Sequence, residues 1–146
     1  MVMNQPASGE IPQWPKKSPA LRVLVVDDEP LIRWSVSETL ADAGHHVVEC
    51  GDGYCARAAV RDAARPFDVI VLDLRMPDSE DLSLLTSLRK IAPKTEVILM
   101  TAYGTPEIVG AALDLGAFRV LNKPFELFDL AQLVAAAGAH ATTPDA

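Results

Sequence analysis

Residues 68–77 read DVIVLDLRMP, a continuous apolar run that ends at an acid. A run such as 69–72, apolar at every position, is typical of a strand with both faces buried in a parallel sheet. The next residue, Asp73, carries a carboxylate, and burying an unpaired carboxylate is costly. The stretch therefore predicts an interior strand, and at its end an acid that water must hydrate or a partner neutralise.

Further strand-like runs alternate with helix-like segments along the chain. The predicted strands cover residues 21–26, 46–50, 68–72, 96–100 and 118–122. The second and fifth are the most mixed in composition, which indicates edge strands. Predicted helices stop before Gly44, Pro66, Pro93 and Gly116, and a last one covers about 126–137. Thr105 and Pro106 form the clearest helix start. Strand and helix alternate five times, which predicts an α/β fold with helices on both faces of a parallel sheet.

We expect one domain between flexible ends. Residues 1–19 carry four prolines with Ser, Gly, Gln and Lys, which is typical of a flexible tail. The last residues, ATTPDA, are expected to fray. The predicted organisation is a tail at 1–19, a domain at 20–138 and a second tail at 139–146.

Composition restricts the class of protein. The net charge is −7 and the pI about 4.8, which argues against a basic nucleic-acid-binding surface. The apolar runs are too short for a membrane span, and the start of the chain lacks a secretory signal, so we expect a cytoplasmic protein. We expect Cys50 and Cys55 to be ordinary thiols in a reducing compartment. His45 and His46 are expected to form a solvated pair at a turn.

Polar side chains follow four of the five predicted strands. They are Asp27 and Asp28 after the first, Asp73 after the third, Thr101 after the fourth and Lys123 after the fifth. Ligands of open parallel sheets bind outside the carboxyl ends of the strands. Singly, these residues are explained as helix caps, a turn residue and a surface charge. Together they favour a site, because capping does not explain the lysine.

The predicted cluster suits a magnesium ion and a reaction at phosphorus. Clustered carboxylates raise one another's proton affinity unless a cation compensates them. Oxygen ligands without His or Cys suit Mg²⁺, which commonly takes one or two carboxylates. A remaining carboxylate that faces Mg²⁺, a lysine and a hydroxyl is a candidate nucleophile that would form an aspartyl phosphate.

The segments VLVVDDEP, VLDLRMP, MTAYG and VLNKPF, in this order and spacing, resemble the receiver domain of two-component response regulators. The resemblance covers about residues 20–138 and looks most like the NtrC-like group. It implies a flavodoxin-like (βα)5 three-layer sandwich with a five-stranded parallel sheet in strand order 2-1-3-4-5. NtrC-like receivers normally precede an ATPase and a DNA-binding domain. Neither fits in this chain of 146 residues, so we expect a stand-alone or an excised receiver.

The resemblance also assigns roles to the metal ligands. Asp73 matches the phosphoacceptor and a ligand of Mg²⁺. Asp28 matches the direct carboxylate ligand, and Asp27 its neighbour, which acts directly or through water. The backbone carbonyl of Arg75 matches the third protein ligand.

The remaining roles concern the phosphoryl group. Thr101 matches the hydroxyl that moves toward it, and Lys123 the lysine that pairs with it. Ala102 is small and would leave room for the phosphate. The bond between Lys123 and Pro124 is expected to be cis.

As a receiver, the chain would take its phosphoryl group from a sensor histidine kinase or a phosphotransfer protein. It would not be a conventional enzyme, but would catalyse its own Mg²⁺-dependent phosphorylation and slow autodephosphorylation. The phosphoryl group would bias a two-state equilibrium that reshapes the surface around the fourth helix, fifth strand and fifth helix. The implied partners include an unidentified downstream protein and a second copy on phosphorylation, with no nucleic acid or membrane.

The sequence departs from the family pattern at two positions. Val120 stands where many receivers have Tyr or Phe, and the nearest aromatic residue is Phe118. Asp81 stands where a glycine is common after the phosphoacceptor loop. Arg75 and Tyr103 occupy flanking positions that tune phosphoryl lifetime in such domains.

Two rival functions remain as alternatives. A HAD-type phosphatase also uses an aspartate nucleophile and Mg²⁺, but it needs an Asp-x-Asp-x-Thr pattern that DDEPL lacks. A pseudo-receiver, which binds partners without taking phosphate, would be expected to have lost a member of the set. The complete set of acids, threonine and lysine therefore favours a working receiver.

Overall fold

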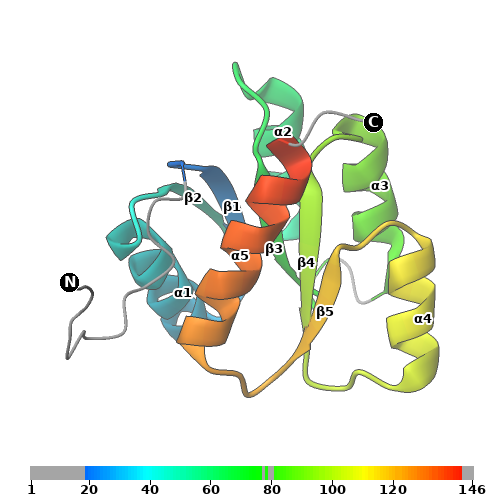
Figure 1. Ribbon diagram of the computed structural model, residues 1–146. Helices are drawn as coiled ribbons and strands as arrows, with labels where there is room; N and C mark the ends of the chain where they lie inside the picture. Colours follow the sequence, from blue (N-terminus) through cyan, green and yellow to red (C-terminus); the bar gives the residue numbers. More distant parts are fainter. Residues whose placement is uncertain (1–18, 77, 79–80, 143–146) are drawn as a thin grey trace.

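The computed structural model describes residues 19–76, 78 and 81–142, and its centre is a five-stranded sheet (Figure 1). The strands are β1 (Arg22–Val26), β2 (His46–Cys50), β3 (Val69–Asp73), β4 (Glu96–Thr101) and β5 (Arg119–Asn122). All neighbouring strands run parallel, in the order β2-β1-β3-β4-β5. This order confirms the predicted flavodoxin-like topology. The predicted tail at 1–19 lies almost entirely outside the described residues, and so do residues 143–146.

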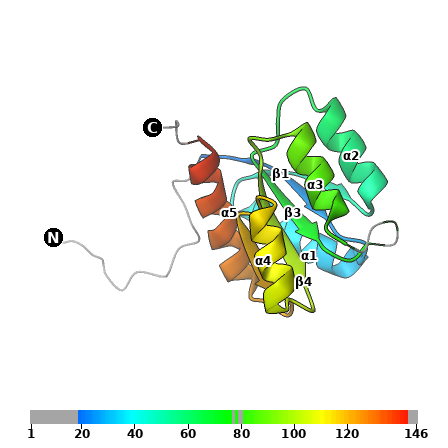
Figure 2. The same cartoon turned by 90° about the vertical axis from the view of Figure 1, so that its right-hand side faces the viewer.

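Helices cover both faces of the sheet, which makes the predicted three-layer sandwich (Figure 2). They are α1 (Pro30–Asp42), α2 (Gly53–Asp62), α3 (Ser83–Ile91), α4 (Pro106–Asp114) and α5 (Leu127–Thr142). Helices α1 and α5 pack on one face, and α2, α3 and α4 contribute to the apolar cluster on the other. The last helix continues five residues past its predicted end at Ala137, so residues 139–142 of the predicted C-terminal tail are helical.

None of the described helices is long and apolar enough to cross a membrane.

Strand β3 is buried at every position, as its sequence predicts. Val69 and Val71 pack in the cluster under α1 and α5, whereas Ile70 and Leu72 pack in the cluster under α2 and α3. Successive side chains of a strand point to opposite faces, and here each face is covered by helices. The same strand therefore belongs to both cores and ends at Asp73.

The capping prediction for α4 is confirmed. The Thr105 hydroxyl accepts a hydrogen bond from the Ile108 N–H at 3.3 Å, and Pro106 occupies the first turn. Past the helix end, Gly116 has φ of +101°, a left-handed conformation that favours glycine.

Two predictions for the β2 edge are wrong. Cys50 and Cys55, expected to be separate thiols, form a disulfide with their Cα atoms 5.5 Å apart. The reason is local, because the short turn after β2 brings the first turn of α2 back over the end of the strand. Of the histidine pair expected to be solvated, His46 is exposed, but His45 is buried and its Nδ1 accepts a hydrogen bond from the Leu21 N–H at 3.1 Å. Burial lowers its pKa, although Asp68 opposes the shift.

Candidate functional site

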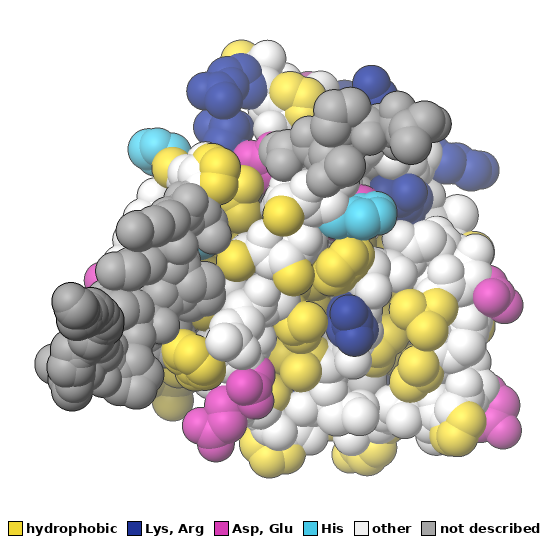
Figure 3. Space-filling view, in the orientation of Figure 1, with side chains coloured by type: hydrophobic (Ala, Val, Ile, Leu, Met, Phe, Trp, Pro, Cys, Tyr) yellow, Lys and Arg dark blue, Asp and Glu magenta, His cyan; other side chains and the backbone are white. Residues whose placement is uncertain are grey.

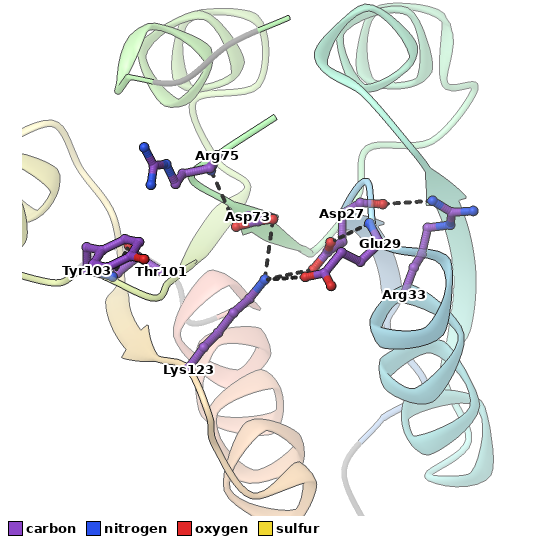
Figure 4. A network of polar contacts seen from close by, with 8 residues as sticks. All are labelled: Asp27, Glu29, Arg33, Asp73, Arg75, Thr101, Tyr103 and Lys123. Carbon is purple, nitrogen blue, oxygen red and sulfur yellow. Dashed lines mark hydrogen bonds and ion pairs between the residues drawn. The ribbon is translucent and has the colours of Figure 1, made fainter. Parts of the chain in front are cut away.

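The acids predicted at the strand ends lie together at the carboxyl edge of the sheet (Figure 4). Asp73 is the last residue of β3, and Asp27 directly follows β1. Because Val26 pairs with Leu72 in the register of these strands, the residues that follow them come side by side. Both acids are buried, with Asp27 0% and Asp73 5% exposed, so each needs a compensating partner.

Lys123, which directly follows the edge strand β5, supplies that partner. Its Nζ lies 3.3 Å from Asp27 Oδ2 and 3.3 Å from Asp73 Oδ2. The peptide bond between Lys123 and Pro124 is cis, as expected. One ammonium thus contacts two buried carboxylates, which leaves the group with an excess negative charge.

The three predicted carboxylate ligands fit a divalent cation. Ligand oxygens of Asp27, Asp28 and Asp73 all lie within 4.8 Å of one another, and Asp28 is exposed. Hard oxygen donors in a cluster open to water on one side suit Mg²⁺, which keeps several waters. Beside them, the Arg75 backbone N–H donates to Asp73 Oδ1 at 3.4 Å.

Burial and charge set the proton affinities of the central pair. The pKa of the Asp73 carboxyl is raised to about 6 because burial, and then the neighbouring Asp27 carboxylate, disfavour its charged form, with Lys123 opposing them. Burial alone would lower the pKa of the Lys123 ammonium, but the two carboxylates outweigh burial and raise it. At neutral pH the lysine is charged and Asp73 is mostly ionised.

Thr101 lies at the same edge, but its hydroxyl is engaged within its own loop. It is fully buried at the end of β4, and its Oγ1 accepts a hydrogen bond from the Tyr103 N–H at 3.1 Å. The Lys123 N–H donates to the Thr101 carbonyl at 2.8 Å, so the backbones of the two residues are joined. Ala102, predicted to line a phosphate pocket, is exposed.

Two residues near the acids were not predicted. Glu29 donates its backbone N–H to Asp27 Oδ1 at 2.9 Å, and its Oε1 lies 3.8 Å from Lys123 Nζ. Arg33 donates to the Asp27 carbonyl at 2.8 Å and to Glu49 at 3.2 Å. The third acid of the DDEP segment could have indicated Glu29. For Arg33 the available signal was its position one helical turn after Glu29.

Two carboxylates between β3 and α3, those of Asp78 and Asp81, accept backbone hydrogen bonds that the sequence analysis did not predict. Asp78 accepts hydrogen bonds from the N–H groups of Gly53 at 2.9 Å and Tyr54 at 3.0 Å, at the start of α2. Those bonds, the Gly53 bond first, lower the pKa of Asp78. Asp81, which replaces the common glycine, accepts from the Ser83 N–H at 2.9 Å. Asp81 thus forms its hydrogen bond one residue before Leu82, the N-cap position of α3.

Arg75 and Tyr103, the two predicted flanking residues, contact each other above this edge. The guanidinium carbon of Arg75 lies 5.2 Å from the centre of the Tyr103 ring, within the range of a cation–π interaction. The tyrosine is 63% exposed, so the pair lies at the solvent side of the site.

Comparison with known proteins shows what this arrangement is similar to. Residues 23–135 match the family model described as "Response regulator receiver domain". The chain is 35% identical over 127 residues to the DNA-binding transcriptional regulator NtrC of Azospirillum brasilense, covering 87% of this chain and 26% of that protein. It thus spans about a quarter of the length of the NtrC and PilR relatives it matches.

Solved structures agree with the sequence comparison. A CheY-like receiver domain protein from Methanospirillum hungatei superposes with a TM-score of 0.78 at 25% identity, covering 84% of this chain and 97% of that one. The beryllofluoride-activated NtrC4 receiver domain dimer superposes with a TM-score of 0.77 at 30% identity, covering 83% of this chain and 98% of that one.

Proposed function

Because this chain belongs to the response regulator receiver domain family, we propose that it accepts a phosphoryl group on Asp73 from a phosphohistidine. The donor would be a sensor histidine kinase or a phosphotransfer protein. The observation that carries the proposal is the contact of one lysine with two buried acids, Asp27 and Asp73, beside a third acid, Asp28.

In this proposal Asp27, Asp28, Asp73 and the Arg75 carbonyl hold Mg²⁺. The ion would neutralise charge on the transferring phosphoryl oxygens. Ligand oxygens of the three acids lie within 4.8 Å of one another, and the pKa of Asp73 is raised to about 6. Cation binding would relieve the repulsion within the cluster, which is the physical reason for expecting affinity here.

The proposed transfer is a displacement at phosphorus. A carboxylate oxygen of Asp73 forms a bond to phosphorus as the bond from phosphorus to the donor imidazole nitrogen breaks, and that nitrogen keeps the electron pair. The Lys123 ammonium, now 3.3 Å from Asp73, would pair with the phosphoryl oxygens. Water would later hydrolyse the acyl phosphate and restore the carboxylate.

Thr101 would respond to the new charge. Its oxygen accepts a bond from the Tyr103 N–H, so the hydroxyl hydrogen is available for donation to a phosphoryl oxygen. Such a donation would draw the segment between β4 and α4 toward Asp73. The small side chain of Ala102 leaves room beside it. We propose that this movement, rather than rotation of an aromatic residue at position 120, transmits the signal.

The surface for the phosphohistidine donor is proposed to be a groove between α1 and the segment that follows Lys123. It is lined by Leu31, Ile32, Ser35, Val36, Ala102, Lys123, Pro124, Phe125 and Leu127. Leu31, one of the lining residues, is 73% exposed, and Trp34 on the same helix is 58% exposed. A helix docked here would present its phosphohistidine next to Lys123.

A separate face is proposed for the output. Figure 3 shows hydrophobic patches on the face formed by α4, β5 and α5, and Leu113 and Leu115 are exposed near the end of α4. An unidentified downstream protein, or a second copy of the chain on phosphorylation, would bind this face; the similar NtrC4 receiver is described as a dimer. With a net charge of −7, nucleic acid is not a proposed partner. The proposed function implies a cytoplasmic location, because the kinase that supplies the phosphoryl group needs ATP.

The proposal is tested by incubating the protein with Mg²⁺ and acetyl phosphate and measuring its intact mass. One added phosphoryl group is expected, which should disappear in Asp73→Asn and on chelation of Mg²⁺. Asp114→Asn, an exposed acid on α4, serves as the matched control and should keep the adduct. If neither an adduct nor saturable beryllofluoride binding is observed, the pseudo-receiver alternative replaces this function.

A further inference from the structure

The disulfide closes the turn that connects β2 to α2. Cys50 is the last residue of β2 and is 3% exposed, whereas Cys55 is in the first turn of α2 and is partly exposed. The side chain of Asp52 also accepts a hydrogen bond from the Cys55 N–H at 2.7 Å, so the same turn is held by one covalent bond and one helix cap.

Both ends of this closed turn are bonded to the acidic site. At the strand end, the Cys50 carbonyl accepts the Asp27 N–H at 3.1 Å. At the helix end, the N–H groups of Gly53 and Tyr54 hold Asp78, which belongs to the loop that follows Asp73. The turn follows the edge strand β2, beside the end of β1, and is hydrogen-bonded both to the Asp27 backbone and to Asp78.

We propose that Cys50 and Cys55 form a thiol–disulfide exchange site whose redox state controls the geometry of the acidic cluster. Disulfides in reducing compartments are usually transient, catalytic or redox-sensing rather than structural. The substrate class is a small dithiol or a protein with a redox-active dithiol. The reducing compartment and the effect on Mg²⁺ both rest on the proposed function, whereas the exchange reaction itself can be measured without it.

Cys55 is the less buried of the two cysteines, so we expect an external thiolate to attack its sulfur. A thiolate of the external dithiol attacks Cys55 Sγ, the bond to Cys50 Sγ breaks, and Cys50 leaves as a thiolate that takes a proton. The second thiol of the reductant then displaces Cys55 from the mixed disulfide. Two electrons pass from the dithiol to the protein, which ends with two thiols while the reductant ends as a disulfide.

Reduction would remove the covalent closure but leave the hydrogen bonds. Asp52 would still cap α2 and Asp78 would still accept from Gly53 and Tyr54, so the fold persists. Without the disulfide, the turn between Cys50 and Cys55 has more conformations available to it, and only these hydrogen bonds restrain it. We expect more frequent opening of the turn and looser placement of Asp27 and of the loop that follows Asp73.

A first experiment measures the site without any metal. The protein is oxidised with glutathione disulfide or reduced with dithiothreitol, alkylated and weighed, and amide hydrogen exchange is measured for residues 51–56. Two alkylated cysteines and faster exchange at Gly53 and Tyr54 are expected only after reduction. Cys55→Ser, chosen because residue 55 is the less buried, should exchange like the reduced protein and not respond to dithiothreitol.

A second experiment measures the effect on the acidic cluster by calorimetric titration with MgCl₂. The dissociation constant should be about fivefold larger after reduction, at the lower end of typical coupling between sites. Asp78→Ala should reduce that difference, because it cuts the link between the turn and the loop. Equal affinity in both redox states, or failure of the cysteines to pair under oxidant, would overturn the proposal. If neither state binds Mg²⁺, the proposed function fails instead, and the exchange rates still decide whether the turn responds to reduction.

Discussion

Lys123 Nζ lies 3.3 Å from Asp73 Oδ2, although strand β4 separates the strands from which the two residues come. The lysine follows β5 and its side chain extends over the end of β4 to reach both Asp73 and Asp27. The contact lowers the pKa of the Asp73 carboxyl, against burial and the Asp27 carboxylate, which together raise it to about 6.

Replacing Lys123 with methionine should leave the two buried acids without their cation. We expect a loss of about 1–3 kcal/mol in the free energy of unfolding at neutral pH, less than for a fully buried pair because the site is open on one side. Added Mg²⁺ should restore part of the loss, since a divalent cation compensates the same carboxylates. Denaturant unfolding with and without Mg²⁺ measures both effects. Lys94→Met, at an exposed position, is the control and should change little.

The raised pKa of Asp73 makes stability depend on pH in a defined direction. With a folded-state pKa of about 6 against an ordinary 3.8, the folded protein binds more protons than the unfolded chain between these values. Protonated Asp73 therefore contributes stability that is fully present below the ordinary pKa and is lost as the pH rises through about 6. The Asp73→Asn variant has no carboxyl to ionise here. Without Mg²⁺, its free energy of unfolding relative to the wild-type protein should therefore increase by about 1 kcal/mol between acid and neutral pH, allowing for solvent screening. An advantage that is constant with pH would contradict the assigned pKa.

The hydroxyl of Thr101 should matter for the response more than for phosphoryl uptake. Thr101→Val keeps the shape but leaves the Tyr103 N–H without its acceptor, at a cost of about 1 kcal/mol. We expect the valine variant to take up phosphate while amide exchange in α4 no longer changes on beryllofluoride binding. Thr101→Ser, which keeps the hydroxyl, should retain the change. Identical responses in both variants would show that the hydroxyl does not transmit the signal.

Removal of the Asp78 carboxylate should loosen the start of α2. Asp78→Ala loses two backbone hydrogen bonds to Gly53 and Tyr54, and we expect a cost of about 1–2 kcal/mol and faster amide exchange at these positions. Asp81→Ala removes only an exposed hydrogen bond to the Ser83 N–H and should not alter exchange at Gly53. Unfolding and exchange measured together separate the two carboxylates.

Two helical glycines give a matched pair for the packing. A Cβ at Gly110, on the exposed side of α4, would meet nothing within 4 Å. Gly110→Ala should therefore stabilise the protein by about 0.5–1 kcal/mol. A Cβ at Gly138 on α5 would collide with the buried Leu21 side chain, so Gly138→Ala should destabilise by about 1–3 kcal/mol despite the same gain in helix propensity. Thermal unfolding of both variants checks the opposite signs.

Much of the fold could be predicted because β3 and its neighbours carry apolar runs that only a doubly covered parallel sheet explains. The strand order itself came from the resemblance, since periodicity does not order strands. The acids could be located because the carboxyl ends of parallel strands share one edge, which is why Asp27 and Asp73 were expected to meet.

The parts that escaped prediction depend on side-chain direction and on contacts between distant segments. No local pattern shows that the Thr101 hydroxyl is engaged by Tyr103. The pairing of Cys50 with Cys55 depends on the path of a turn, and the burial of His45 on its hydrogen bond to Leu21. Asp78 acts on a helix 24 residues earlier in the chain, a distance that sequence spacing cannot connect.

Strand β3, which belongs to both apolar clusters, also limits how fast and how far the phosphoacceptor can move. Any sliding of the strand would shift side chains in the two clusters at once, and close-packed interiors resist such shifts. Asp73 is thus a fixed point, and relaxation must occur in the segments around it, where loops move on nanosecond to microsecond timescales. In spin-relaxation measurements, fast nanosecond motion should therefore be found in the turn that follows β4, while residues 69–72 remain rigid.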